Sequence, residues 1–322
     1  MPVLLLHRSQ LNSTQWDNFI AASPQRILYA YSWYLDTISP DWQALVLAKN
    51  DQWQTVMPLP CRKKWGLNVV QQPFFCQLLG VFTHPSVDFQ EASNALLTEL
   101  TASFCYISTY SGRFAEHTIF PEGLKVTNAT NLILPLHCPY SVLFQNYTRD
   151  RQLNLKRAKN FNWASQQSTD IEPLIQLFSE NHATQIEGGV AGSSFDLLRN
   201  VTALLAQKKA LRLVYAVRDG LMEAGVLFAI FSHRIIYLFN AASPAGRKGN
   251  ARTWLIDQMI REYAQTDFVF DFESPDIPSI ASFYESFGAQ KEIYTQLSFN
   301  NLPFPLKQIQ EWRIEKHIRK KG

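Results

Sequence analysis

Residues 234–263 read RIIYLFNAASPAGRKGNARTWLIDQMIREY, and the order of elements in this stretch decides the fold class. Residues 234–240 predict the last strand of a three-stranded meander, and residues 251–263 predict a helix because their apolar side chains recur at helical spacing. Residues 241–250 connect the two with a loop that contains two glycines and two cations. The start of a helix offers unpaired backbone N–H groups and the positive end of the helix dipole, which together bind phosphate. A glycine loop before a helix is also a common plain connection, so the surrounding elements decide what it means.

The elements on either side follow a regular order. Before this stretch, the pattern predicts a strand, two helices and two strands, at residues 163–166, 169–178, 195–205, 211–217 and 222–231. The dipeptide Asp219-Gly220 is a strong hairpin signal between the last two strands. After it, we expect a buried strand, a short helix and a final strand, at residues 268–272, 278–287 and 292–299. The basic tail beyond Pro305 predicts a terminal helix packed through Ile309 and Trp312.

The length of the chain and a change in its character indicate two domains. At about 150 residues per domain, the 322 residues suffice for two. The first 137 residues alternate short strands and helices, and residues 139–160 then form a helical segment rich in Arg and Lys. We therefore predict an α/β protein with mixed sheets, divided into residues 1–138 and 139–322. The basic residues of the connecting segment face either solvent or the phosphates of a ligand.

Composition and charge exclude several classes of protein. Hydrophobic residues make up 46% and charged residues 18%, which excludes a disordered or coiled-coil chain. The sequence pI of about 8.6 is lower than the domain pI of a general nucleic-acid binder, which usually exceeds about 9. The four cysteines show no metal-ligand spacing, so we expect reduced thiols and no metal site. The longest apolar run is far shorter than the ~20 residues that cross a bilayer, so we expect a cytoplasmic protein without a membrane span.

Four common site motifs are absent from the sequence. Asn250 follows Gly249, so the loop is not the GxxxxGKS/T loop of Walker-type nucleotide hydrolases. No GxGxxG lies between a strand and a helix, which leaves the usual dinucleotide-binding fold unsupported. The GxSxG and HExxH motifs are missing as well, and the common hydrolase and zinc-protease sites are thereby excluded.

The order of elements resembles that of the GNAT superfamily of acyl-CoA N-acyltransferases. The pyrophosphate loop of that family has the form Gln/Arg-x-x-Gly-x-Gly/Ala, and the matching stretch here runs from Gly246 to Ala251. Its Gly-x-Ala end fits, but Gly246 stands where the family has Gln or Arg, and Arg247 follows one place later. The stretch FYESFGA at residues 283–289 is similar to the family's FYxxFGF helix. Together these similarities cover roughly residues 162–299.

Pairs of GNAT-like domains occur in Fem-type peptidyltransferases and in CelD-like acyltransferases. The stretch LNLKRAKN at residues 153–160 resembles the basic helix that precedes their second domain, and FDFE at residues 270–273 resembles a strand of that domain. Fem-type enzymes have Phe-Lys where this chain has Phe283-Tyr284, which favours acyl-CoA over aminoacyl-tRNA as donor. The resemblance therefore implies two tandem GNAT-like domains, of which the first lacks a donor site and the second binds acyl-CoA.

The resemblance also implies which residues bind the donor. Backbone N–H groups near the end of the fourth strand would hold the thioester oxygen, and the loop that follows would hold the pyrophosphate. The implied donor-binding residues are Leu238, Phe239, Asn240, Gly246, Arg247, Lys248, Gly249, Asn250 and Ala251.

Acyl transfer to an amine also needs groups that move protons. Tyr284 matches the family tyrosine that protonates the departing thiolate, and its alternative role is packing in the core. Asp271 and Glu273 are expected on one face of the fifth strand, where either could accept the proton of the amine. A hydrogen bond to the next turn or an ion pair would equally explain these carboxylates.

The sequence therefore predicts an N-acyltransferase that moves an acyl group, with acetyl expected, from acyl-CoA to an amine on a small molecule or peptide. Two alternatives stay open. The basic stretch from Arg149 to Lys159 motivates a Fem-type transferase that uses aminoacyl-tRNA, whereas Gly246 in place of Gln or Arg motivates a non-catalytic binding protein. Residues 187–192 predict a flexible loop, which either covers the acceptor or is a plain linker.

Overall fold

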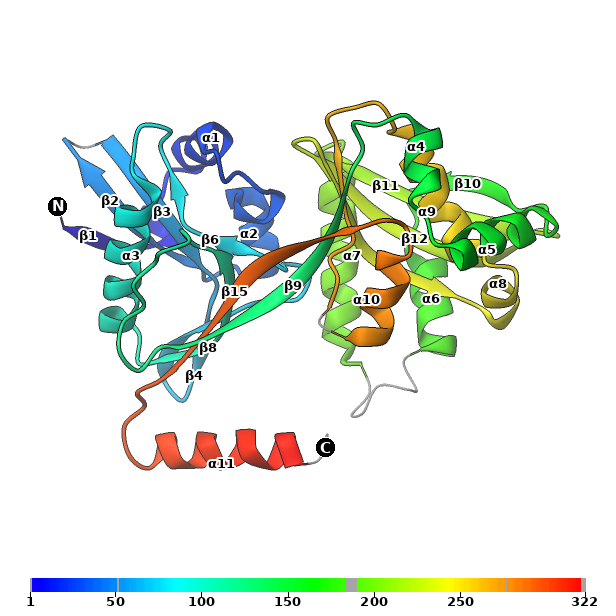
Figure 1. The fold of residues 1–322 in the computed structure, drawn as a ribbon. Helices are drawn as coiled ribbons and strands as arrows, with labels where there is room; N and C mark the ends of the chain where they lie inside the picture. The colour runs from blue at the N-terminus through cyan, green and yellow to red at the C-terminus, as the bar shows by residue number, and fades with distance from the viewer. Residues whose placement is uncertain (1, 51, 183–189, 276, 320–322) are drawn as a thin grey trace. The chain divides into compact units, whose positions relative to one another are not determined.

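The computed structural model describes the chain except residues 1, 51, 183–189, 276 and 320–322 (Figure 1). The chain forms two compact units: residues 1–129 together with 294–322, and residues 130–293. This division differs from the predicted one at residues 1–138 and 139–322. The reason is that the last strand pairs antiparallel with a strand of the first unit, which returns the C-terminal segment to that unit.

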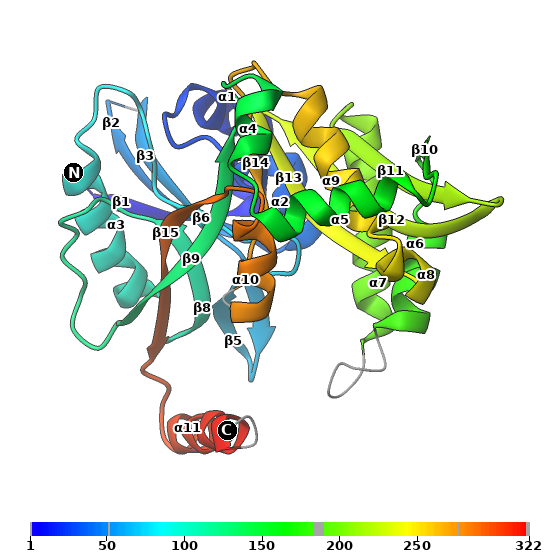
Figure 2. The same cartoon turned by 45° about the vertical axis from the view of Figure 1, so that its right-hand side comes forward.

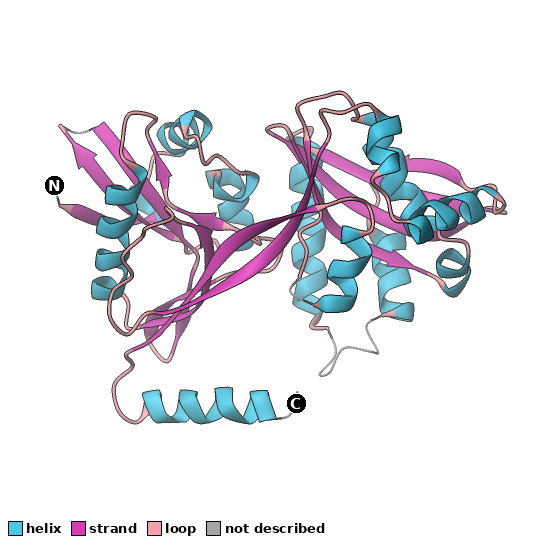
Figure 3. Cartoon of the chain, viewed as in Figure 1, coloured by secondary structure: helices cyan, strands magenta, loops and turns pink. Residues whose placement is uncertain are grey.

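The N-terminal unit contains two groups of strands with short helices between them (Figure 3). Its elements before the boundary are β1 (Val3–His7), η1 (Arg8–Gln10), α1 (Ser13–Ala22), η2 (Leu28–Ala30), α2 (Ser32–Ile38), β2 (Gln43–Lys49), β3 (Gln52–Leu59), β4 (Cys61–Lys64), β5 (Leu67–Gln71), β6 (Leu79–Gly80), β7 (Phe82–Thr83), α3 (Phe89–Ser103) and β8 (Tyr106–Arg113). The strands β9 (Lys125–Pro135) and β15 (Gln290–Asn300) cross the unit boundaries along the chain, and α11 (Leu306–Arg319) follows β15. One sheet has the order β1-β2-β3-β7, and the other group has the order β15-β8-β5-β4, with β6 on β8.

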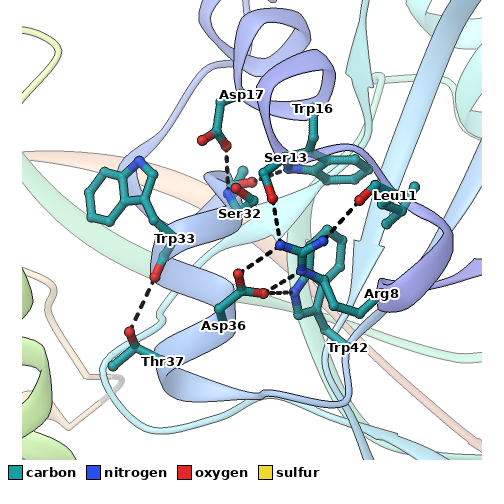
Figure 4. A network of polar contacts seen from close by, with 11 residues as sticks. Arg8, Leu11, Ser13, Trp16, Asp17, Ser32, Trp33, Asp36, Thr37 and Trp42 are labelled. Carbon is teal, nitrogen blue, oxygen red and sulfur yellow. Dashed lines mark hydrogen bonds and ion pairs between the residues drawn. The ribbon is translucent and has the colours of Figure 1, made fainter.

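The core of the N-terminal unit is rich in tryptophan. Trp16 and Trp42 are fully buried and pack edge to face, with ring centroids 4.8 Å apart. Figure 4 shows the polar network beside them, in which Arg8 binds both carboxylate oxygens of Asp36 and Trp42 donates to Asp36 at 2.8 Å. Because aromatic residues dominate protein interiors, these side chains belong to a packed core.

The C-terminal unit contains a meander flanked by helices. Its elements are α4 (Tyr140–Gln145), α5 (Arg149–Lys159), β10 (Ala164–Ser168), α6 (Glu172–Asn181), α7 (Gly192–Gln207), β11 (Leu211–Arg218), β12 (Leu221–Phe231), β13 (Arg234–Ala242), α8 (Pro244–Lys248), α9 (Ala251–Glu262), β14 (Val269–Asp271) and α10 (Pro278–Glu285). The strand order is β10-β11-β12-β13-β14-β9, in which β13 and β14 are parallel and the other neighbours are antiparallel. The mixed sheet expected from the sequence is therefore present.

Helices cover both faces of this sheet (Figure 2). Helices α6 and α7 contact one face, and α9 packs on the other with α5 against it. The main core of the unit lies under α5, α9 and α10, where Phe228, Phe270 and Phe287 are fully buried. This core positions the end of β13 and the start of α9, which are the two parts of the expected site.

Two predicted loops, at residues 241–250 and 187–192, have different outcomes in the structure. The predicted loop at residues 241–250 contains a short helix, α8, because Ser243 caps it and Pro244 begins it. Residues 187–189 of the predicted flexible loop lie outside the described residues, and α7 begins at Gly192. Within the residues that are described, no helix is both long enough and apolar enough to span a membrane.

Candidate functional site

Strand β13 leaves its parallel neighbour β14 after a short contact. The two strands pair only through Arg234–Ile236 and Val269–Asp271, and β13 continues to Ala242 beyond the end of β14. The pairing of β13 with β12 shifts at Leu238, since Phe239 lies opposite Leu227 while Tyr237 lies opposite Phe228. The extra residue of such a bulge stays outside the regular ladder. The three residues predicted to hold the thioester oxygen lie at this irregularity: Leu238, Phe239 and Asn240.

Helix α8 follows β13 and lies against the backbone of β12. The Ser243 hydroxyl accepts the N–H of Gly246 at 3.0 Å and donates to the carboxylate of Glu223. A Cβ on Gly246 would lie 2.0 Å from the backbone oxygen of Glu223, so no side chain fits there. This contact explains why the chain has glycine where the GNAT loop has Gln or Arg.

Gly249 has a packing role that sequence reasoning did not anticipate. A Cβ at this position would lie 2.3 Å from the ring of Trp163 and 2.8 Å from that of Phe161. The indole N–H of Trp163 also donates to the Gly249 carbonyl at 2.9 Å. The missing side chain therefore makes room for two stacked aromatic rings, and it does not open the backbone to a ligand on that side.

The start of α9 has no side-chain cap. Asn250 precedes it in the left-handed conformation, with φ of 54°, and its side chain makes no capping hydrogen bond. The first N–H groups of a helix have no partner within the helix. A ligand with negative charge can therefore approach the positive end of α9.

A cavity of about 370 Å³ lies at this helix start. Three arginines line it, Arg151 from α5, Arg247 from α8 and Arg252 from α9, together with His182 and Phe283. Among the predicted donor-binding residues of the loop, Gly246, Arg247 and Asn250 line the cavity, whereas Lys248, Gly249 and Ala251 do not.

Arg151 is the buried member of this group. Its Nε donates to Ser286 at 2.8 Å and its Nη1 donates to Thr253 at 2.7 Å, and both partners are hydroxyl groups. Burial, together with the charge of Arg252, lowers the pKa of Arg151 to about 10. Arg151 therefore remains charged at neutral pH.

Arg151 and Arg252 share one aromatic ring. Their guanidinium carbons lie 4.1 and 4.3 Å from the centre of the Phe283 ring. Arg252 also donates to the Asn240 side chain at 3.0 Å, and Arg247 donates to the carbonyl of Ala242 at 2.9 Å. No carboxylate of the described residues pairs with any of the three arginines. Since uncompensated buried charge is costly, the cavity favours an anionic ligand.

His182 belongs to the same cavity and was missed from the sequence. It follows the end of α6 and hydrogen-bonds the backbone of Ala242, and burial together with Arg247 and Arg252 lowers its pKa. Its imidazole is therefore neutral at pH 7. No spacing in the sequence connects residue 182 with the loop, so only the fold could find it.

Tyr284 combines a core ring with an unbonded hydroxyl. Its ring stacks on Phe272 with centroids 4.8 Å apart and meets Tyr237 edge to face at 5.8 Å. Burial raises the pKa of Tyr284 to about 12, and Glu273 adds to the effect. The hydroxyl has no hydrogen-bond partner among the described residues and stays protonated across the neutral range.

The two candidate carboxylates lie in different surroundings. Asp271 is buried and accepts from Arg234 at 2.7 Å, from Asn131 at 2.8 Å and from the N–H of Glu273 at 2.9 Å. β14 ends at Asp271, and Glu273 has a left-handed φ of 46°. The prediction that both lie on one face of the strand is therefore wrong, because the chain turns after Asp271. Both oxygens of Asp271 are already hydrogen-bonded, which makes Asp271 a weaker candidate for the base than the sequence suggested.

Three other basic residues of α5 line a separate groove of about 900 Å³, beside α4 and α9. Arg149, Lys156 and Lys159 lie along it, and Trp254 contributes an indole ring. At its base, the buried Asp257 accepts from Tyr140 at 2.8 Å and from Tyr147 at 3.1 Å, and burial raises its pKa. In the described part of the chain, no three His, Cys, Asp or Glu side chains gather in a way that could hold a metal ion.

Comparisons with known proteins agree with this geometry. Residues 144–276 match the family described as "Acetyltransferase (GNAT) domain". The solved structure titled "Crystal structure of FemX" superimposes with a TM-score of 0.64 at 14% identity, over 96% of this chain and 99% of that chain. A "Tandem GNAT protein from the clavulanic acid biosynthesis pathway (without AcCoA)" gives a TM-score of 0.53 at 11% identity, over 94% of this chain and 99% of that one. No curated protein matches the chain in sequence.

A third solved structure, an "Acetyltransferase from GNAT family from Colwellia psychrerythraea", gives a TM-score of 0.52 at 11% identity over 93% of this chain and 100% of that chain. At such low identity these likenesses concern the fold. The family match covers the bulged strand, α9 and the residues that line the cavity except Phe283. Residues 144–276 therefore match a GNAT acetyltransferase domain, and the fold of the chain is similar to the folds of FemX and the tandem GNAT protein.

Proposed function

We propose that the protein is an N-acyltransferase that takes its acyl group from acyl-CoA and transfers it to an amine. The observation that carries this proposal is the cavity at the start of α9. There, three arginines without a carboxylate partner among the described residues meet an uncapped helix start. A pyrophosphate fits such a place because charge-assisted hydrogen bonds and the helix dipole both favour it.

In this reaction, different residues of the C-terminal unit bind the donor and transfer protons. Arg247, Arg252 and the start of α9 hold the diphosphate, and the bulge at Leu238 supplies a backbone N–H group for the thioester oxygen. Tyr284 holds a proton at its hydroxyl that the departing thiolate can take, since its pKa of about 12 keeps it protonated. Glu273 accepts the proton of the amine.

Calorimetry with CoA and acetyl-CoA tests the donor site. Arg247 and Lys248 are exposed neighbours on α8, but only Arg247 lines the cavity. We expect Arg247→Ala to weaken CoA binding about ten-fold, which corresponds to one hydrogen bond from a charged group, and Lys248→Ala to change it little. Equal losses in both variants, or no binding by the wild type, would contradict the site. A change at Gly249 would be a poor test because it disturbs the packing of Trp163.

Consumption of acetyl-CoA in the presence of small-molecule and peptide amines tests catalysis separately. Tyr284→Phe keeps the ring stacked on Phe272 and removes only the hydroxyl. We expect it to lower kcat by about a hundred-fold while the KM for the donor stays nearly unchanged, since proton transfer contributes roughly that factor. CoA binding without turnover by any acceptor would instead support a non-catalytic binding protein.

A Fem-type reaction with aminoacyl-tRNA is the second candidate, favoured by the groove beside α5. Arg149, Lys156 and Lys159 line it without a carboxylate partner among the described residues, and Trp254 provides a surface for stacking. If tRNA binds there, its affinity falls steeply with salt and drops in Lys156→Glu with Lys159→Glu. The same variant would leave CoA binding unchanged under the first proposal.

A further inference from the structure

Helix α11 is attached to the N-terminal unit by one side only. Leu302 before it is buried, Leu306 packs beside the cluster of Val69 and Tyr106, and Gln310 donates to the Tyr106 hydroxyl at 2.7 Å. The sequence predicted packing through Ile309 and Trp312 instead. That prediction is wrong, because these side chains are 41% and 59% exposed and the helix is rotated onto Leu306 and Gln310.

The segment from residue 304 to residue 314 concentrates exposed apolar side chains. Four of the twelve large apolar side chains that are exposed in the described part of the chain lie between residues 304 and 314: Phe304, Ile309, Trp312 and Ile314. Phe304 is 83% exposed, the highest value of the twelve. Single exposed apolar residues are ordinary, but a cluster of this kind marks an interaction surface.

Two segments of the N-terminal unit contribute cations to this region. The helix carries Lys307, Arg313 and Lys316, and β4 carries Arg62, Lys63 and Lys64. Burial lowers the pKa of Lys64, and repulsion from Arg62 and Arg313 adds to this, so Lys64 of β4 and Arg313 of α11 are neighbours in space. Figure 1 shows β4 close to α11. None of the six forms an ion pair with a described residue. Helix α11 also carries the exposed Glu311 and Glu315, so on these two segments the six cations outnumber two carboxylates and the surface is positive.

We propose that α11 and the edge of β4 form a surface that binds the headgroup layer of an anionic bilayer. Phe304, Ile309 and Trp312 enter the boundary between headgroups and acyl chains, while the cations contact the lipid phosphates. The ammonium group of Lys316 lies 4.9 Å from the ring centre of Trp312. The lysine charge and the indole ring would therefore contact the same part of the bilayer.

The combination of side chains favours a bilayer over other partners. A soluble polyanion would use the cations but not the exposed Phe304 and Ile309. A second copy of the chain would bring six further cations against the first six, and like charges across an interface oppose association. A bilayer with acidic lipids can bind both the cations and the exposed apolar side chains. Such binding requires no spanning helix.

Flotation of the full-length protein with vesicles tests the proposal. One set of vesicles is pure phosphatidylcholine, and the other contains equal parts of phosphatidylcholine and phosphatidylglycerol. We expect binding to the mixed vesicles at low salt and none to the neutral ones. Arg313→Glu with Lys316→Glu should reduce binding at least about ten-fold, since each cation near an acidic surface contributes measurably. Ile309→Ser with Trp312→Ser should reduce it comparably.

Two matched controls separate the surface from general effects. Lys248→Glu reverses an exposed charge of the other unit, and Leu221→Ser removes an apolar side chain that is 64% exposed there. Both should leave vesicle binding unchanged, and thermal unfolding should show that all variants fold. Equal binding to neutral vesicles, or binding that the α11 variants do not reduce, would overturn the proposal.

Two further results would assign the surface to another partner and thus also overturn the proposal. One is a dimer in solution that the α11 variants dissociate, in a protein that does not bind vesicles. The other is binding to soluble polyphosphate, lost on charge reversal but kept in Ile309→Ser with Trp312→Ser. The proposal does not depend on acyl transfer, so vesicle binding and CoA binding can fail independently.

Discussion

Two arginine sites, one in each unit, differ in the partners of their guanidinium groups. In the N-terminal unit, Arg8 binds Asp36 through two nitrogens, at 2.5 and 2.9 Å, and lies over the ring of Trp42 (Figure 4). In the C-terminal unit, Arg151 and Arg252 lie over the ring of Phe283 with hydroxyl and amide partners but no carboxylate. A neutralised arginine stabilises its own unit, whereas arginines left without an anion are suited to bind one from outside.

The starts of two corresponding helices repeat this contrast. Helix α3 follows β7, the last strand of the four-stranded sheet, and α9 follows the meander β11-β12-β13 after the short helix α8. Helix α3 is capped by the Asp88 carboxylate, which accepts from the N–H of Glu91 at 2.8 Å, and Glu91 adds a second negative charge in the first turn. Helix α9 has an uncapped start surrounded by arginines. The acidic start of α3 supports the expectation that the N-terminal unit lacks a donor site.

The largest expected effect concerns the close packing that builds the helix start in the C-terminal unit. Gly246→Ala places a Cβ 2.0 Å from the Glu223 backbone oxygen, whereas Gly192→Ala meets nothing within 4 Å. We expect Gly246→Ala to lower the free energy of unfolding by about 3 kcal/mol, the upper range for overpacking, and Gly192→Ala to change it little. Urea unfolding measures both. Equal stability of the two variants would show that α8 can move away from β12.

A pair of matched substitutions tests the arginine contrast directly. We expect Arg151→Met to raise the free energy of unfolding by about 1 kcal/mol, because it removes a buried charge without a carboxylate partner, and to weaken CoA binding more than ten-fold. Arg8→Met should lower stability by about 1 kcal/mol and leave CoA binding unchanged, since Asp36 loses its partner at a partly exposed site. Changes of the same sign in both variants would remove the distinction between the two settings.

The helix caps offer a smaller effect. Asp88→Ala removes the hydrogen bond to the N–H of Glu91 and should cost about 1 kcal/mol of stability. CoA should not bind to the N-terminal unit of this variant, because Glu91 still places a negative charge in the first turn of α3. Calorimetry that finds a second CoA site would contradict this account of the N-terminal unit.

The smallest effect is a dependence of stability on pH. Burial raises the pKa of Asp257 in the folded protein, so ionisation of this group opposes folding. The cost is absent below the unfolded pKa of ~4, grows as the pH rises towards the folded pKa, and is constant above it. Asp257→Asn keeps an acceptor for Tyr140 and Tyr147. The difference in Tm between this variant and the wild type should grow in favour of the variant by about 2 °C from pH 4 to pH 7. A difference that shrinks with rising pH would reverse the assigned sign.

Much of the C-terminal unit was predictable from the sequence. The turn at Asp219-Gly220 and the apolar spacing after it placed β11, β12 and β13 within two residues of their observed bounds. Helix α8 was missed because a capped turn of five residues has too little apolar pattern to distinguish it from a loop. The resemblance to the GNAT loop also pointed to Arg247 and Asn250, which line the cavity.

Local sequence by itself determined the order of strands and helices, the meander and the basic connection before α9, because propensity, turn chemistry and apolar period act over a few residues. Only the tertiary structure decided which cations meet. Arg151 and His182 reach the cavity from α5 and α6, Gly246 and Gly249 prove to be packing glycines, and α11 turns Trp312 outward. These outcomes depend on contacts between segments that are far apart in the chain, and the sequence pattern of one segment does not predict which other segments will contact it.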